Sequence, residues 1–194
     1  MKVAIIGKGH VGTALATGLK RAGHEIVFGH RDPKEPVRDA AKWGEVIILA
    51  VPFGAVKQVA KEIGSLANGK PVVDVTNVLG PMGEWAVGCT TSGAEELQKL
   101  LPRAHVVKAF NTVFAKNQST GRVGEERLSG FIAGDDAEAK KTVMQISQDI
   151  GFDPVDAGPL HSARYLEPLA LLNIRLAFDL RMGVNIGFKL VKAG

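Results

Sequence analysis

The feature that most constrains this chain is a glycine-rich turn near its start, made of Gly7, Lys8, Gly9, His10, Val11 and Gly12. An apolar run at residues 3–6 precedes it and predicts a strand that is buried on both faces. A helical pattern with Leu15 and Leu19 on one side follows it. In such a strand–turn–helix, the first glycine allows a tight turn, the second lets the backbone approach a pyrophosphate, and the third lets helix and strand pack closely. The context predicts dinucleotide binding; the alternative is a turn with incidental glycines.

The end of the second predicted strand carries the residues that distinguish one dinucleotide from another. This strand spans residues 25–28 and is followed by His30, Arg31 and Lys34. An NAD site usually has a carboxylate here to bind the ribose 2′-hydroxyl, whereas an arginine suits a 2′-phosphate. The first carboxylate is Asp32, which precedes a proline and is typical of a turn. The pattern favours NADP over NAD; the alternative is a solvated cluster of charges.

Strand-length apolar runs alternate with segments of helical periodicity along the rest of the chain. Further strands are predicted at residues 46–51, 71–75, 105–110, 130–134 and 154–156. Helices are predicted at residues 56–66, 95–101, 136–150 and 163–181. This alternation predicts an α/β fold of the Rossmann type, with a doubly wound, mostly parallel sheet and a C-terminal helix. We expect residues 1–194 to form a single NADP-binding domain, with a helical extension over residues 159–194.

The connection after the second strand is unusually short. Only residues 32–45 separate that strand from the strong apolar run that starts at Val46. A helix together with a third strand would need more residues than this, so one or both are expected to be lost or reduced. The sheet edge beyond the second strand should therefore be open.

Composition narrows the class of protein further. Apolar residues make up 45% and charged residues 23%, the balance of a soluble globular protein. Cys89 has no second cysteine for a disulfide, and we expect a cytoplasmic protein without a targeting or membrane-spanning segment. The net charge of +4 is too small to indicate a nucleic-acid partner, and the histidines lack metal-ligand spacing, so no metal site is expected. A glycine-rich stretch at 77–92 is typical of a functional loop.

Several motifs resemble those of the NADP-binding oxidoreductases related to coenzyme F420-dependent NADP reductase. Beside the glycine turn, they are VIILAVPF at 46–53, VKAFNTV at 107–113, and Gly-Asp-Asp at 134–136. The most selective pieces are DAGPL at 156–160, followed by Ala163-Arg164 and Leu166-Glu167, and IGFKL at 186–190. The resemblance covers nearly the whole chain. It implies a direct hydride exchange between the nicotinamide C4 of NADP(H) and a deazaflavin (coenzyme F420) or a flavin.

The resemblance also implies roles for individual residues. It places Lys8, His10 and Val11 at the phosphate turn, and His30 with Arg31 at the 2′-phosphate. The other implied contacts are Val51, Pro52 and Phe53 beside the adenosine or ribose, Asn77 near the nicotinamide, and Asn111, Thr112 and Val113 as the floor under the two rings. Hydride transfer between stacked rings needs positioning and exclusion of water more than an acid or a base, so no catalytic residue is assigned.

The last helix suggests a partner and leaves an alternative open. Residues 166–180 are apolar on most sides, which predicts burial by the sheet and by a second subunit in a homodimer. His161 and Ser162 lie at the start of this helix, where they could reach the acceptor ring, or where Ser162 could cap the helix.

The alternative function, from a different class, is a non-catalytic NADP(H)-binding redox sensor.

Overall fold

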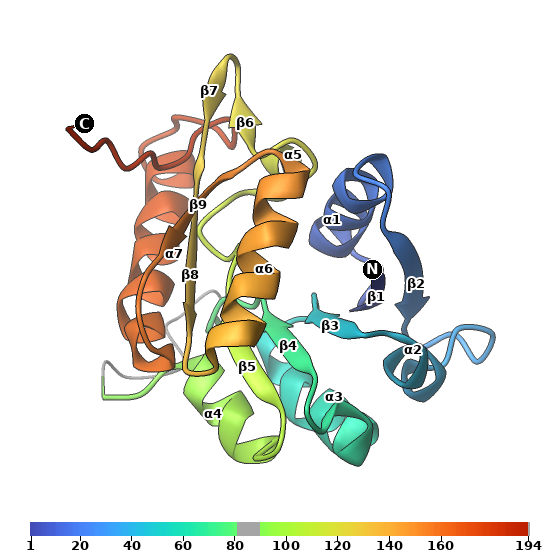
Figure 1. The fold of residues 1–194 in the computed structure, drawn as a ribbon. Coiled ribbons are helices and arrows are strands. Elements are labelled where there is room, and N and C mark those ends of the chain that lie inside the picture. The colour runs from blue at the N-terminus through green and yellow to red at the C-terminus, as the bar shows by residue number, and fades with distance from the viewer. Residues whose placement is uncertain (81–89, 194) are drawn as a thin grey trace.

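The computed structural model describes residues 1–80 and 90–193, and their centre is a seven-stranded sheet of order β2-β1-β3-β4-β5-β8-β9 (Figure 1). The strands are β1 (Lys2–Ile6), β2 (Glu25–Gly29), β3 (Val46–Leu49), β4 (Pro71–Asp74), β5 (His105–Lys108), β8 (Ser129–Gly134) and β9 (Asp153–Asp156). Neighbouring strands pair in parallel, apart from the antiparallel pair β5 and β8. The predicted Rossmann-type, mostly parallel sheet is confirmed.

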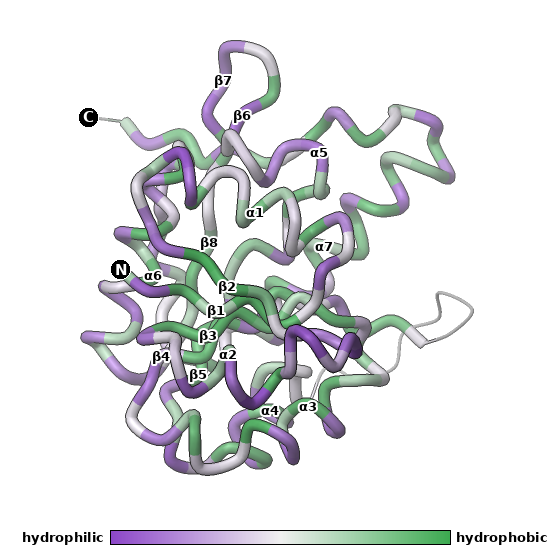
Figure 2. The backbone as a smooth tube through the Cα atoms, turned by 90° about the vertical axis from the view of Figure 1, so that its right-hand side faces the viewer, coloured by the Kyte–Doolittle hydropathy of each residue, from purple (hydrophilic) through white to green (hydrophobic). Residues whose placement is uncertain are grey.

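Helices cover both faces of this sheet (Figure 1). They are α1 (His10–Arg21), α2 (Val37–Trp43), α3 (Val56–Ile63), α4 (Gly93–Leu100), α5 (Ala115–Gln118), α6 (Ala137–Ile150) and α7 (Ala163–Phe178), with 3₁₀ turns at Phe53–Ala55, Gly64–Ala67 and Leu160–Ser162. On β1, Val3 and Ile5 belong to a core shared with α1 and α6, whereas Ala4 and Ile6 belong to a core shared with α2 and α3. Burial on both faces explains why the central strands are continuous apolar runs, which are green in Figure 2.

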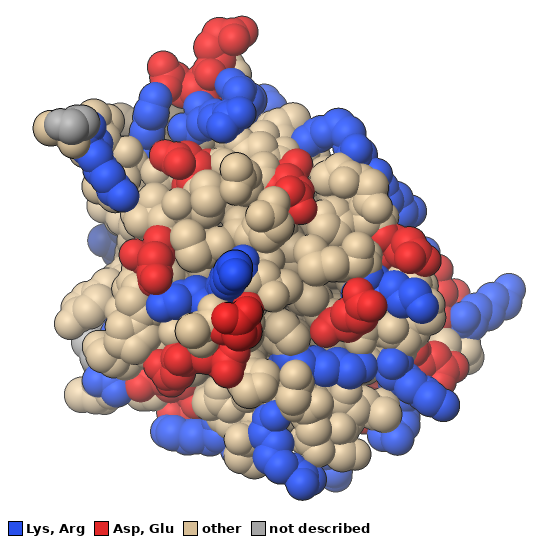
Figure 3. Space-filling view, in the orientation of Figure 1, with Lys and Arg blue, Asp and Glu red and all other residues tan. Residues whose placement is uncertain are grey.

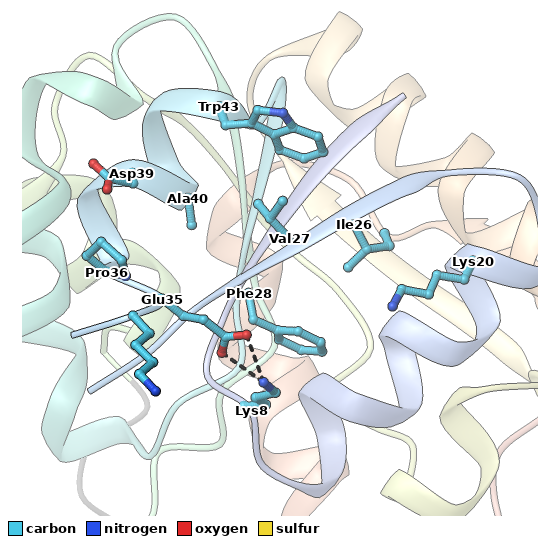
Figure 4. Close-up of a pocket in the computed structure, with 11 residues that line it drawn as sticks. Lys8, Lys20, Ile26, Val27, Phe28, Glu35, Pro36, Asp39, Ala40 and Trp43 are labelled. Atoms are coloured by element: carbon cyan, nitrogen blue, oxygen red, sulfur yellow. Dashed lines mark hydrogen bonds and ion pairs between the residues drawn. The ribbon is translucent and has the colours of Figure 1, made fainter. Parts of the chain in front are cut away.

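The short connection after β2 retains its helix and loses its strand. Helix α2 follows β2 directly, and within the described residues no strand lies beyond β2 in the sheet. The common order of such sheets is 3-2-1-4-5-6, so the strand that would cover β2 is the missing one. A cavity of about 650 Å³ lies along this edge, bordered by Ile26, Val27 and Phe28 of β2 and by Ala40 and Trp43 of α2 (Figure 4). The predicted open edge is confirmed.

The N-termini of α6 and α7 differ in how they are capped. The side chain of Asp136 accepts a hydrogen bond of 2.8 Å from the Ala139 amide, which confirms the predicted cap of α6. Ser162 makes no such bond, because the 3₁₀ turn Leu160–Ser162 leads directly into α7. Helix α7 ends at Phe178, three residues earlier than the sequence indicated.

Two segments without a clear periodicity pack together beside β8. A small hairpin of β6 (Arg122–Val123) and β7 (Glu126–Arg127) precedes that strand. The chain after α7 returns to it: the Ser129 amide donates to the Phe188 carbonyl at 2.9 Å, and Lys189 pairs with Glu126. The IGFKL motif therefore closes the edge of the hairpin and β8.

A fully buried lysine joins four elements of the fold. The Lys108 ammonium, at the end of β5, lies 2.9 Å from both the Asp74 and the Glu167 carboxylates and donates to the Thr76 carbonyl at 2.7 Å. Burial alone would lower the pKa of Lys108, but the two carboxylates outweigh it, so the pKa is raised and the group stays charged. Glu167 also accepts the Gly93 amide at 3.0 Å, so the N-terminus of α4 helps to offset the second negative charge. The cluster fixes α7 and α4 against β4 and β5.

Replacing this lysine should destabilise the fold strongly. In Lys108→Met, two buried carboxylates would face each other without a cation, and we expect the free energy of unfolding to fall by about 3–5 kcal/mol. Urea denaturation followed by circular dichroism measures the loss. The control is Lys99→Met, which removes an exposed ion pair with Glu96 and should cost less than about 1 kcal/mol. Equal, small losses in both variants would contradict a structural role for the buried cluster.

Candidate functional site

The glycine turn is shaped by two contacts that leave no room for a side chain. Gly7 has φ +110°, and a Cβ there would lie 2.2 Å from the Ala50 carbonyl oxygen at the end of β3. A Cβ on Gly12 would lie 2.2 Å from the Gly7 carbonyl oxygen. Both glycines therefore have the steric roles predicted for them, the tight turn and the close helix–strand packing. A Cβ on Gly9 would meet nothing within 4 Å, so this side of the turn is open to a ligand.

The glycine turn places the N-terminus of α1 beside a cleft. Helix α1 has no side-chain cap at Gly9 and no acidic residue in its first turn, which leaves its first amide groups available to an anion. The predicted residues His10, Val11 and Gly12 form this first turn. Phosphate-binding sites of the Rossmann type use this arrangement.

The cleft has a volume of about 990 Å³ and lies at the carboxyl ends of β1, β2 and β3. Its lining includes the predicted residues Gly7, Lys8, Gly9, His30, Arg31, Val51 and Pro52. Strand β1 pairs with β2 on one side and with β3 on the other, so the cleft opens where the strand order reverses. Open α/β sheets bind their ligands at such a switch point, and the volume suits a nucleotide.

Lys34 and Phe53 lie at the borders of this cleft. Lys34 lines the neighbouring cavity along the β2 edge. Phe53 begins the 3₁₀ turn after β3, and its ring lies 3.1 Å from the position that a Cβ on Gly93 would take. Phe53 therefore points from the cleft toward the N-terminus of α4.

The remaining predicted residues form a second group at the ends of β4 and β5. The Asn111 amide nitrogen lies 3.4 Å from the Asn77 amide oxygen and donates to the Leu166 carbonyl of α7 at 3.0 Å. The Thr112 carbonyl accepts from Asn173, also on α7, at 3.0 Å. Asn111, Thr112 and the neighbouring Val113 are buried, and the Asn111 amide oxygen is buried without a hydrogen-bond partner in the described residues. Asn77, Asn111 and α7 thus meet in one place.

The motif pairs Ala163-Arg164 and Leu166-Glu167, at the start of α7, anchor this helix to its neighbours. Arg164 makes a two-pronged ion pair with Glu95 of α4, at 2.6 and 2.9 Å, which holds the pKa of that carboxyl below its usual range. Leu166 supplies the carbonyl that binds Asn111, and Glu167 completes the Lys108 cluster. His161 and Ser162 lie in the 3₁₀ turn that leads into this anchored helix.

The sequence patterns did not predict two sets of residues that contribute to the site. One is the buried cluster of Asp74, Lys108 and Glu167, for which charged residues ending the apolar runs PVVD and HVVK were the available signal. The other is Glu35, whose carboxylate binds Lys8 at 2.8 Å and also pairs with His30. No sequence pattern linked Glu35 to the glycine turn, because the two lie 27 residues apart.

Three further properties of the described residues concern metal ligands, membrane-spanning helices and the distribution of surface charge. Among residues 1–80 and 90–193, no three His, Cys, Asp or Glu side chains are placed to hold a metal ion. Within the same residues, no helix has both the length and the apolar character needed to cross a membrane. Lys and Arg side chains are interspersed with Asp and Glu on the face drawn in Figure 3. Part of the predicted loop at 77–92, including Cys89, lies outside the described residues.

The sheet, the glycine turn and the cleft define a Rossmann-type dinucleotide-binding domain. The chain belongs to the family described as NADP oxidoreductase, coenzyme F420-dependent, whose model matches residues 2–38 and 32–78. A crystal structure of a protein provisionally named F420-dependent NADP reductase, from Arthrobacter sp. FB24, is 30% identical and superposes with a TM-score of 0.91. That match covers 99% of this chain and 100% of the other.

Curated relatives have two different names. The F420-dependent NADP reductase of Methanothermobacter marburgensis is 28% identical, and the match covers 98% of each sequence. Metalloreductase STEAP3 of Rattus norvegicus is 36% identical over 88% of this chain. The chain spans only 37% of the length of that metalloreductase.

Proposed function

We propose that this protein binds NADP(H) in the cleft at the ends of β1, β2 and β3 and exchanges a hydride with a deazaflavin, coenzyme F420, or a flavin. The observation that carries the proposal is the open glycine turn: Gly9 leaves free space at an uncapped helix N-terminus, inside a cleft of about 990 Å³. Membership of an NADP oxidoreductase family supports the same cofactor. The bound dinucleotide would supply the hydride.

The chain's own residues would bind and orient that cofactor. We expect the amides of His10 and Val11 to bind the pyrophosphate, with Lys8 beside them, and Arg31 to bind the 2′-phosphate. The end of β3, at Val51 and Pro52, would flank the adenosine. These residues lie in the cleft or in the first turn of α1.

The nicotinamide would lie toward the second group of residues. Asn77 and Asn111 present amide groups there, and the Asn111 oxygen lacks a partner among the described residues. Asn77 is only partly buried, so its amide is the one of this pair that a nicotinamide carboxamide would reach. Thr112 and Val113, both buried, would form a dry floor, and exclusion of water favours hydride transfer over side reactions.

Turnover with separate acceptors tests the proposed reaction. NADPH is mixed with the protein and, in turn, with coenzyme F420, FMN or FAD, and the absorbance of the reduced nicotinamide is followed. We expect the absorbance to fall together with reduction of the deazaflavin or of a flavin. The name of the metalloreductase relatives adds a chelated, reducible metal ion as a further acceptor to include. Tight NADPH binding without turnover on any acceptor would contradict the reaction and favour a redox sensor.

The assignment of Arg31 makes a separate prediction about cofactor choice. Arg31→Ala should weaken NADPH binding by about 1.5–3 kcal/mol more than NADH binding, the worth of a charged hydrogen bond to the 2′-phosphate. Fluorescence titration of each reduced nucleotide measures both affinities. The control is Arg103→Ala, an exposed arginine beyond the end of α4, which should change neither. Equal losses for NADPH and NADH in Arg31→Ala would show that Arg31 does not contact the 2′-phosphate.

We also propose that a second copy of this chain covers the exposed face of α7. Large apolar side chains are mostly exposed there and just beyond the helix end, with Tyr165 73% exposed, Phe178 61%, Leu180 64% and Met182 60%. Exposed apolar side chains grouped in this way are typical of an interface between proteins. Such a contact would bury the apolar side chains that α7 leaves exposed.

Light scattering at several protein concentrations tests the dimer. We expect the mass of two chains for the unaltered protein and of one chain for Phe178→Asp, because a charge would be buried in the interface. A charge change of the same size on the exposed Lys57 of α3, Lys57→Gln, should leave the dimer intact. A concentration-independent mass of one chain for the unaltered protein would rule the dimer out.

A further inference from the structure

One carboxylate engages two of the basic side chains that border the nucleotide cleft. Both Glu35 oxygens accept from the Lys8 ammonium, at 2.8 and 2.9 Å, as the dashed lines in Figure 4 show. The same carboxylate is bound by Nε2 of His30. Lys8 comes from the glycine turn and His30 from the end of β2, so Glu35 joins the two loops that border the cleft.

Hydrogen bonds within the loop that carries Glu35 hold this contact in place. The His30 amide donates to the Glu35 carbonyl at 2.9 Å, and the Glu35 amide donates to the Asp32 carbonyl at 3.0 Å. The Lys34 amide donates to the Asp32 side chain at 2.9 Å, and the Asp32 amide donates to Nδ1 of His30 at 3.2 Å. Because Nδ1 accepts this bond, the proton of a neutral His30 ring is on Nε2, where it is donated to Glu35.

Glu35 is charged under ordinary conditions. The hydrogen bond from Lys8 lowers its pKa, partial burial opposes this, and the hydrogen bond from His30 lowers it further. Arg31 stands apart from this group: it lines the cleft and forms no ion pair with a carboxylate of residues 1–80 or 90–193. The loops thus offer an unengaged guanidinium together with a lysine and a histidine that are already bound by an internal anion.

We infer that Glu35 is a specificity-determining residue that weakens the preference for a 2′-phosphorylated nucleotide. A 2′-phosphate that binds Arg31 beside His30 must accept the repulsion of the Glu35 carboxylate or displace it from His30, whereas a 2′-hydroxyl meets no such cost. The choice between NADPH and NADH is then a balance, with Arg31 favouring the phosphate and Glu35 opposing it. The inference rests on the proposed nucleotide site and does not depend on the acceptor.

A second role for Glu35 predicts the opposite effect. If the carboxylate only holds Lys8 and His30 in place for a phosphate, its removal leaves both side chains disordered and weakens NADPH binding. If it acts as a competing anion, its removal frees both side chains, ends the repulsion and strengthens NADPH binding. The sign of the change separates the two roles.

The test compares Glu35→Gln with the unaltered protein by fluorescence titration of NADPH and NADH, without an acceptor. We expect the ratio of the NADH to the NADPH dissociation constant to rise roughly tenfold, as one like charge is removed beside the phosphate at a partly exposed site. Calorimetry with adenosine 2′,5′-bisphosphate against 5′-AMP repeats the comparison with probes that lack the nicotinamide. The control is Asp39→Asn, which removes the same charge from the neighbouring cavity without touching Lys8 or His30.

Every outcome bears on the inference. A rise in the ratio confined to Glu35→Gln supports it, and so does NADPH binding that appears only in that variant. An unchanged ratio, a shift toward NADH, or an equal rise in Asp39→Asn overturns it while leaving the nucleotide site in place. If neither protein binds either nucleotide or either probe, the proposed nucleotide site is wrong and the inference falls with it. Absence of turnover, measured separately, affects only the proposed reaction.

Discussion

The buried ammonium of Lys108 is the interaction on which the C-terminal half of the structure depends. It holds the ends of β4 and β5 together through Asp74 and the Thr76 carbonyl, and it holds α7 through Glu167. Asn77 and Asn111 follow the same two strands by three residues each. The buried cluster around Lys108 therefore holds the backbone in the position where Asn77 and Asn111 contact each other and the α7 backbone. A site built on such a cluster is preorganised, because its supporting groups cannot rearrange without exposing buried charge.

The N-terminal half depends instead on close approach of the backbone. Gly7 and Gly12 leave space for no side chain, and this brings the turn against the end of β3 and the start of α1 against β1. The loss of the strand beyond β2 does not disturb this arrangement, because a nucleotide cleft needs only the carboxyl ends of β1, β2 and β3. It does leave β2 as an edge with a cavity beside it, and the loop of residues 30–35 folds back on itself at that edge.

Local sequence was sufficient to predict what local physics decides. The glycine turn, the apolar strands and the Asp136 cap depend on residues a few positions apart, and each was found. The hairpin of β6 and β7 was missed because strands of two residues are too short to show alternation. The ion pairs of Glu35 with Lys8 and of Lys108 with Glu167 were missed because they join residues far apart in the chain, and only the folded topology brings them together. Lys8 and His30 were recognised as basic residues, but their contact with Glu35 had no sequence signal.

The two ends of the candidate site thus use charge in different ways. At the nucleotide end, Lys8, His30 and Glu35 are 46%, 26% and 36% exposed, so their ion pairs can be exchanged for contacts with a ligand at little cost. At the other end, Lys108 and its carboxylates are at most 1% exposed, and breaking one pair would leave an uncompensated charge in the core. The proposed nucleotide selectivity can therefore change through single surface substitutions, whereas the buried cluster that supports Asn77 and Asn111 tolerates almost none. That division would let one scaffold keep the geometry of the proposed hydride transfer while its preference for a phosphate is adjusted.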